Sequence, residues 1–91
     1  MTDDDVRITE APEDRRYELR LGDALVGVAD YRDQEERPLI VHVGVDPPHR
    51  HRGLAGRLTA HVLDDARARG LTPVPVCSYV AWYVGQHPEA A

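Results

Sequence analysis

The stretch from residue 38 to residue 69 limits the fold of this 91-residue chain more than any other part of the sequence. A run rich in β-branched residues (38–45) is followed by a turn that contains Gly53 and then by a helical pattern over 54–69. The apolar positions that recur at helical spacing are Leu54, Leu58, Val62, Leu63 and Ala66. A strand that leads through a short turn into a helix predicts a fold in which helices pack against a sheet.

Shorter segments complete the expected fold. The expected strands cover residues 6–10, 16–21, 24–31, 38–45 and 72–77. The fourth strand should be central and buried on both faces, whereas Pro73 and Pro75 confine the last strand to an edge of the sheet. Gly70 should stop the long helix, and Ser78 should cap a final helix over 79–86. The order β-β-β-β-α-β-α predicts an α+β (mixed α/β) domain.

Length and composition limit the architecture and the environment. Residues 1–5 are expected to form a disordered acidic tail and residues 6–89 a single domain, because 91 residues leave no room for a second core. No apolar run is long enough to span a bilayer, and the acidic N-terminus is unlike a secretory signal, so we expect a cytoplasmic protein without a membrane contact. The single cysteine, Cys77, excludes an internal disulfide, and a net charge of −5 argues against a nucleic-acid partner.

Residues 49–52 are four consecutive histidines and arginines in an acidic chain. A basic turn before a helix suits a phosphorylated ligand, because free backbone N–H groups and the positive end of the helix dipole meet there. A P-loop needs a lysine, and the chain has none; a dinucleotide-binding fingerprint needs three spaced glycines, and only Gly53 and Gly56 are present. The remaining pattern, R/Q-x-x-G-x-G/A, is met by Arg50, Gly53 and Ala55.

With these residues the sequence is similar to the GNAT superfamily of N-acetyltransferases, and most closely to its minimal, YjdJ-like branch. The resemblance covers about residues 15–89 and is carried by the segments 43–45, 48–58, 74–79 and 83–89. It implies a truncated GNAT-like acyl-CoA N-acyltransferase fold in which the basic turn holds the pyrophosphate of coenzyme A. Acetyl-coenzyme A is then the co-substrate, and the reaction is the transfer of an acetyl group to an amine.

The resemblance and the chemistry of the turn together predict the residues that bind coenzyme A. Gly53 lets the backbone approach a phosphate without a Cβ, and successive N–H groups of residues 50–56 can surround the anion. Neighbouring arginines add positive charge. The expected binding residues are Val43, Val45, Arg50, His51, Arg52, Gly53, Leu54, Ala55, Gly56, Arg57, Ser78 and Tyr79.

Three residues are candidates for the chemical step. His42 is the only titratable side chain of 38–45, and it is either a base or a strand histidine with a structural hydrogen bond. Strict alternation puts it on the opposite face from Leu39, unless a bulge intervenes. Cys77 is either an acyl-accepting nucleophile or a small residue that lines the site. Tyr83 falls where related enzymes carry a tyrosine that protonates the leaving thiolate, or it packs in the core.

The chain lacks parts that shape the acceptor site in larger GNAT enzymes, namely a helical segment between the first two strands and the last strands. The acceptor side becomes an open surface, which suits a protein or peptide amine better than an enclosed metabolite. The alternative is a non-catalytic module that binds acyl-coenzyme A. A homodimer could supply missing walls, so a monomer and a homodimer both stay open. His49 and His51 have no set of partner ligands, so no metal is expected.

Overall fold

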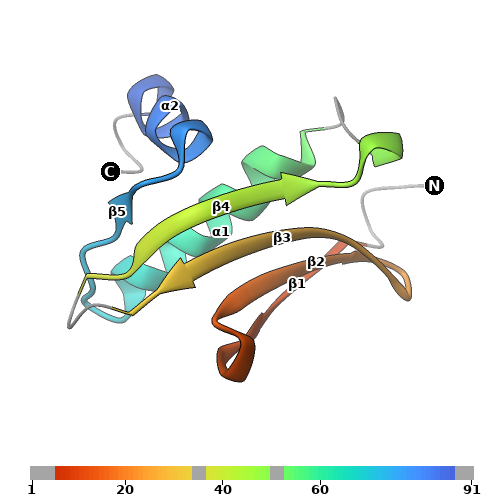
Figure 1. Cartoon of the computed structure of the whole chain (residues 1–91), viewed down its shortest axis with the longest axis horizontal. Coiled ribbons are helices and arrows are strands. Elements are labelled where there is room, and N and C mark those ends of the chain that lie inside the picture. The colour runs from red at the N-terminus through yellow and green to blue at the C-terminus, as the bar shows by residue number, and fades with distance from the viewer. Residues whose placement is uncertain (1–5, 34–36, 50–52, 88–91) are drawn as a thin grey trace.

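The computed structural model describes residues 6–33, 37–49 and 53–87 of the chain. Within these ranges, five strands form one sheet in the order β1-β2-β3-β4-β5, and two helices accompany it (Figure 1). The strands are β1 (Val6–Ala11), β2 (Arg16–Leu21), β3 (Ala24–Arg32), β4 (Leu39–Val45) and β5 (Val74–Pro75). The helices are α1 (Leu54–Ala68) and α2 (Ser78–Gln86), with 3₁₀ turns at Pro12–Asp14 and Pro47–His49. The α+β fold and the order of elements expected from the sequence are confirmed.

The first four strands form an antiparallel meander in which each strand pairs with the next. Alternating polar and apolar residues favour these strands: in β2 every second residue is buried, and the residues between them stay partly exposed. Gly22 turns the chain between β2 and β3 with φ of +59°, a conformation that residues with a Cβ adopt only with strain. The first three strands therefore form within one residue of the expected ranges 6–10, 16–21 and 24–31.

α1 connects β4 to β5, which are parallel neighbours in the sheet. The helix stops at Gly70 as expected: this glycine has φ of +72° and its N–H donates to the carbonyl of Arg67 (3.0 Å). The N–H of Leu71 donates to the carbonyl of Ala66 (2.9 Å). The two bonds satisfy carbonyls that a helix end otherwise leaves without a partner, and the chain then turns back toward β5.

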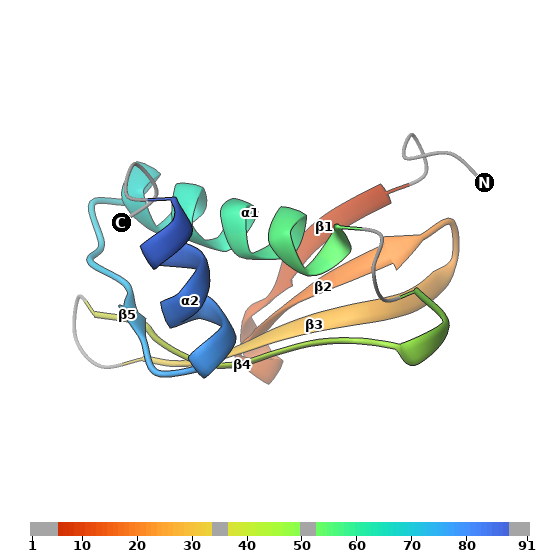
Figure 2. The ribbon, with the colours of Figure 1, turned by 90° about the horizontal axis from the view of Figure 1, so that it is seen from above.

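α1 covers one face of the sheet and leaves the other face open (Figure 2). It packs against β2, β3 and β4, and its buried residues are Leu54, Leu58, Thr59, Val62, Leu63 and Ala66. Leu19, Ile40 and Leu58 come from three different elements and are almost completely buried, so they mark the centre of the core. α2 adds Val80 to the same core.

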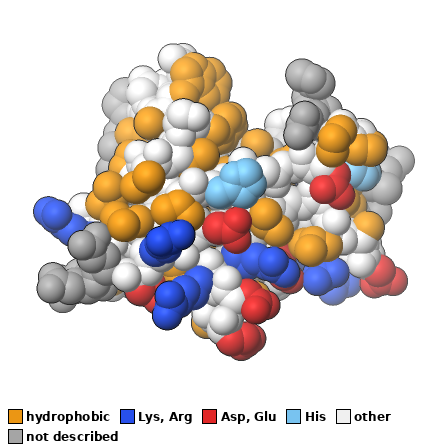
Figure 3. Space-filling view, in the orientation of Figure 1, with side chains coloured by type: hydrophobic (Ala, Val, Ile, Leu, Met, Phe, Trp, Pro, Cys, Tyr) orange, Lys and Arg blue, Asp and Glu red, His pale blue; other side chains and the backbone are white. Residues whose placement is uncertain are grey.

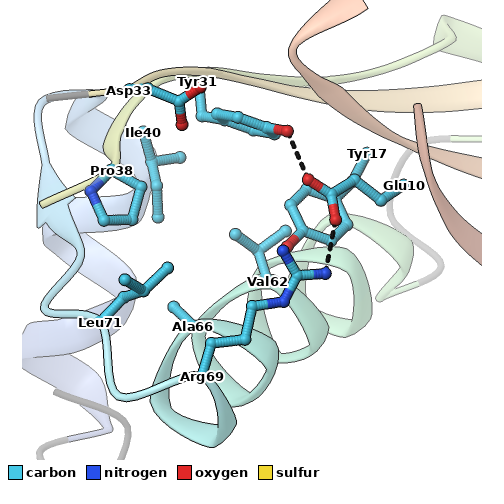
Figure 4. Close-up of a pocket in the computed structure, with 10 residues that line it drawn as sticks. All are labelled: Glu10, Tyr17, Tyr31, Asp33, Pro38, Ile40, Val62, Ala66, Arg69 and Leu71. Atoms are coloured by element: carbon cyan, nitrogen blue, oxygen red, sulfur yellow. Dashed lines mark hydrogen bonds and ion pairs between the residues drawn. The ribbon is translucent and has the colours of Figure 1, made fainter. Parts of the chain in front are cut away.

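A polar cluster joins β1, β2 and β3 to the end of α1 around a small hollow of about 40 Å³ (Figure 4). Tyr31 donates a hydrogen bond to Glu10, and Tyr17 donates one to Asp65. Arg69 bridges the two carboxylates, with its Nη2 at 2.6 Å from Glu10 and 3.1 Å from Asp65. Burial, followed by these hydrogen bonds, raises the pKa of both tyrosines above the ordinary value of 10.0. Both phenols therefore stay protonated at neutral pH.

Three expectations from the sequence are wrong in detail. β5 is shorter than the expected 72–77, because the two prolines of this segment have no N–H to donate to a neighbouring strand. Cys77, and not Ser78, is the N-cap of α2, since Cys77 has an extended backbone (φ −64°, ψ 132°) and the helix already includes Ser78. β4 is not buried on both faces: Ile40 is buried but His42 is exposed, because α1 covers one face alone.

Several expectations lie outside the described residues. They concern the tail at 1–5, part of the charged loop at 34–36, the basic residues Arg50, His51 and Arg52, and the end of the chain beyond 87. In the part of the chain that is described, no helix is long and apolar enough to cross a membrane.

Candidate functional site

β4 and β5 diverge directly after they pair, and this opening is the first feature of the candidate site (Figure 1). β5 pairs with β4 at Leu39 and Ile40. The carbonyl of Ile40 accepts hydrogen bonds from two successive N–H groups, those of Val76 (3.1 Å) and Cys77 (2.8 Å). The chain then enters α2 at Ser78 and leaves the sheet, while β4 continues in its own direction.

A β-bulge in β4 lies beside this opening. Ile40 lies opposite Tyr31 and His42 opposite Asp30, so Val41 is an extra residue without a counterpart in β3. The bulge changes which side chains face α1: the two valines that follow pack against the core, and the histidine is exposed on the open face. The sequence did not decide whether β4 contains a bulge. The structure has one, and it determines the face on which His42 lies.

A hollow of about 220 Å³ lies between the end of β4, the start of α1 and α2. Its lining residues are Val45, His49, Gly53, Leu54, Ala55, Gly56 and Tyr79. Figure 3 shows a notch between the lobe formed by α2 and the turn that follows β4. Gly53 has φ of +74°, and among the described residues nothing lies within 4 Å of the position that its Cβ would occupy. The first N–H groups of α1 and the positive end of its dipole therefore form one wall of this hollow.

Two tyrosines of α2 lie over the first turn of α1. A Cβ on Gly56 would lie 3.7 Å from the hydroxyl of Tyr79 and 3.7 Å from the ring of Tyr83. Tyr79 also packs against Trp82 in a tilted arrangement, with ring centroids 5.7 Å apart, and the rings of Tyr83 and His87 are tilted with centroids 4.4 Å apart. Burial, and then the neighbouring Tyr83, raises the pKa of Tyr79 above 10.0. The Tyr79 hydroxyl is therefore a hydrogen-bond donor at neutral pH, at the wall of the hollow.

His42 lines a different and wider hollow of about 300 Å³ between β3 and β4 on the open face. Its imidazole leans over Gly44, because a Cβ on that glycine would lie only 2.8 Å from Nε2 of the histidine. The ring therefore points along β4 toward its C-terminal end. Cys77 is held at the carbonyl of Ile40, on the other side of His42 along the strand.

The open face around His42 carries charges of both signs (Figure 3). Glu18 binds Arg16 at 2.8 Å and Arg20 at 3.1 Å. The hydrogen bond from Arg16, followed by the one from Arg20, lowers the pKa of Glu18, so this carboxyl is ionised at neutral pH. Asp30 lies opposite His42 in the register of β3 and β4. An imidazole with a carboxylate on the neighbouring strand is an arrangement that can accept a proton.

The structure brings together half of the residues that the sequence predicted for coenzyme A. The hollow of about 220 Å³ contains Val45, Gly53, Leu54, Ala55, Gly56 and Tyr79. Val43 packs against the core from β4, and Arg57 and Ser78 are exposed on α1 and α2. Arg50, His51 and Arg52 lie outside the described residues.

The three candidates for the chemical step do not line the hollow of about 220 Å³ and lie on different parts of the fold. Cys77 is half-buried at the start of α2, Tyr83 lies over α1, and His42 is on the open face. His49 lines the hollow as well, although it was not among the binding residues expected from the sequence. Its place at the start of the basic run was the signal that could have identified it.

Among the described residues, no group of three or more histidine, cysteine, aspartate or glutamate side chains could hold a metal ion.

The comparison with known proteins agrees with this geometry. No curated protein matches the chain. Residues 16–91, which run from β2 through the opening and both helices, match the family model described as GCN5-related N-acetyl-transferase. The resemblance found in the sequence is thereby confirmed, and the chain belongs to the GCN5-related N-acetyltransferase family.

Proposed function

We propose that this chain transfers an acetyl group from acetyl-coenzyme A to an amine. The observation that carries the proposal is the hollow of about 220 Å³, where the start of α1 meets the opening between β4 and α2. Family membership supports an acyl-coenzyme A co-substrate. The open face beside β4 favours a protein or peptide amine as the acceptor, because a wide surface can receive an extended chain.

The start of α1 fits the pyrophosphate of acetyl-coenzyme A. The N–H groups of Leu54, Ala55 and Gly56 belong to the first helical turn, where no carbonyl of the same helix can accept from them. Gly53 has no side chain to cap them, and among the described residues no other side chain does so. An anion is therefore proposed to accept from them, as the helix dipole also favours. Arg50, Arg52 and Arg57 are proposed to add positive charge around the phosphates.

The backbone of β4 fits the pantetheine arm. The N–H of Asp46 donates to the carbonyl of Val26 in β3 (2.8 Å), so Asp46 turns its backbone toward β3. By alternation, the backbone groups of Val43 turn toward the opening. The amides of pantetheine can pair with Val43 in the place where β5 has left the sheet. The thioester then lies near Ile40, where Cys77 begins the path into α2.

Two routes of acetyl transfer are compatible with this placement. In direct transfer, the amine nitrogen forms a bond to the thioester carbon, the C–S bond breaks, His42 takes the amine proton and Tyr83 protonates the leaving thiolate. The imidazole must then turn from Gly44 toward Ile40. In the two-step route, the Cys77 thiol attacks the thioester carbon and passes its proton to the leaving thiolate. The amine then displaces the acetyl group from Cys77, whose thiolate recovers a proton.

Turnover of acetyl-coenzyme A with a panel of peptide and small amines tests the proposal. His42→Ala or Cys77→Ala should lower kcat/KM by about 100-fold or more, the contribution typical of a general base or a nucleophile. Circular dichroism must show that each variant stays folded. Full activity in both variants would show that neither residue takes part in the reaction.

Mass spectrometry separates the two routes. After incubation with acetyl-coenzyme A and no amine, the two-step route predicts one acetyl group on Cys77 and none in Cys77→Ala. Direct transfer predicts an unmodified cysteine. A rise in Tm with coenzyme A but no turnover with any amine would instead support a non-catalytic binding module. No rise in Tm would contradict both functions, since a ligand that prefers the folded state must stabilise it.

A further inference from the structure

The exposed indole of Trp82 is the aromatic surface next to the hollow. Trp82 lies on α2, it is the only tryptophan of the chain, and 56% of it is exposed, whereas tryptophan is highly buried on average. Tyr79 covers one side of it, with the ring planes 42° apart. Tyr79 itself lines the hollow and has its hydroxyl at the first turn of α1. A path of two adjacent aromatic rings therefore leads from the start of α1 to the solvent.

The hollow is too small for the whole of coenzyme A. Its volume of about 220 Å³ is less than the roughly 300–1,000 Å³ typical of sites that enclose a drug-sized ligand. If the pyrophosphate lies at the start of α1 and pantetheine follows β4, the adenosine must extend outside the hollow. A purine offers two apolar faces that stack on aromatic rings. Val76 is equally exposed but aliphatic, so Trp82 is the better partner for such a face.

We propose that the adenine of coenzyme A stacks on the indole of Trp82. The inference rests on the proposed function and adds to it the residue that selects the nucleotide end of the ligand. Tyr79 packs against the indole, and this contact reduces the freedom that the exposed ring loses on binding.

Fluorescence of the single tryptophan reports on this contact directly. Titration with coenzyme A and with dephospho-coenzyme A should change the Trp82 emission, because both ligands carry adenine. 4′-Phosphopantetheine, which lacks the nucleoside, should bind without a comparable change in the Trp82 emission. An equal change with 4′-phosphopantetheine would overturn the inference, since the indole would then respond to the pantetheine arm or to a general rearrangement.

Calorimetric titration of variants completes the test. Trp82→Ala should raise the Kd of coenzyme A by roughly 5- to 150-fold, the range found when an aromatic side chain that stacks on a base is removed. The same variant should leave the Kd of 4′-phosphopantetheine unchanged, and Trp82→Phe should keep most of the affinity for coenzyme A. Val76→Ala, which also truncates an exposed apolar side chain of the same region, is the matched control and should bind both ligands as the wild type does.

The outcomes distinguish this inference from the function on which it rests. If the wild type binds coenzyme A but Trp82→Ala weakens both ligands equally, or neither, the adenine contact is wrong and the proposed function stands. If the wild type binds none of the ligands, both proposals fail. Dephospho-coenzyme A separates stacking from charge, because it keeps the adenine and lacks the 3′-phosphate.

Discussion

At the scale of single residues, the two ends of α1 are each marked by a glycine with a positive φ. Gly53 precedes the helix with φ of +74°, and Gly70 follows it with φ of +72°. Among the described residues, nothing lies within 4 Å of the Cβ position of either glycine, so a side chain there meets backbone strain and no obstacle. Gly53 borders the hollow, whereas Gly70 lies at the opposite end of the helix. The pair can therefore separate stability from binding.

Gly53→Ala and Gly70→Ala should each lower the free energy of unfolding by about 1–2 kcal/mol, the cost of placing an L-residue in the left-handed region. Gly53→Ala alone should also weaken coenzyme A binding, because its methyl group enters the space in front of the first N–H groups of α1. Urea unfolding measures the first effect and calorimetric titration the second. If both variants lost affinity equally, the affinity would depend on the stability of the helix and not on the space at Gly53.

The raised pKa values of Tyr17 and Tyr31 predict that the protein loses stability at alkaline pH. Burial raises their pKa in the folded protein above the ordinary 10.0, so the stability that they contribute is complete below pH 10 and is lost as the pH rises above it. Tyr31→Phe should lower the free energy of unfolding at neutral pH by about 1 kcal/mol, because its hydrogen bond to Glu10 is lost. Above pH 10 the free energies of unfolding of Tyr31→Phe and of the wild type should become more similar. Urea unfolding at several pH values measures it, and a constant difference would contradict the assignment.

At the scale of elements, α1 and α2 meet at Gly56, where Tyr79 and Tyr83 lie over the first turn of α1. Glycine is a poor residue for the interior of a helix, since it has more freedom to lose than alanine. Its presence here leaves room in the wall of the hollow. We therefore expect stability and ligand binding to favour different residues at this position.

Gly56→Ala should raise the free energy of unfolding by up to about 1 kcal/mol and weaken the binding of coenzyme A. The gain comes from helix propensity, and the loss comes from a methyl group 3.7 Å from the Tyr79 hydroxyl. Gly85→Ala in α2 is the matched control, because in the described part of the chain its Cβ position has no neighbour within 4 Å. This control should not change the affinity. Unchanged affinity in Gly56→Ala would show that this position is not part of the binding wall.

Local patterns in the sequence predicted most of these elements. The alternation of β2 and the helical spacing of α1 are both visible in the order of residues, and so is the stop at Gly70. The bulge at Val41 is not, because Val41 differs from its neighbours only in lacking a counterpart in β3. The face on which His42 lies therefore could not be decided from the strand alone.

For the candidate site, too, the sequence predicted some parts and not others. A contiguous motif located the start of α1, and the hollow contains Gly53 and Ala55 of this motif. The relation between His42 and Cys77 depends on how β5 leaves β4, which is a property of the assembled sheet. The expected cap at Ser78 failed for a local reason, since the preceding Cys77 already has the extended backbone of a cap residue.

At the scale of the whole molecule, the segment from β5 to α2 is joined to the rest at a few points. Among the described residues these include the carbonyls of Pro38 and Ile40, the buried Val80 and the tyrosines at Gly56. A ligand that fills the hollow contacts both helices and should hold this segment against the sheet. Coenzyme A should therefore slow amide hydrogen exchange in α2 and at Val76 and Cys77 more than in β1. Exchange followed by mass spectrometry measures this, and equal slowing in β1 would contradict it.

The two ends of α1 differ in how firmly they are fastened. Around Arg69, two tyrosines and two carboxylates bind one another and lock three strands to the helix. At the other end, the helix begins with a bare glycine beside an open hollow. The described contacts thus fasten the end of α1 that lies away from the hollow, and the proposed ligand would add contacts at the end that borders it. Substitutions on the side of α2 that faces the hollow should therefore change the affinity without loosening the contacts around Arg69.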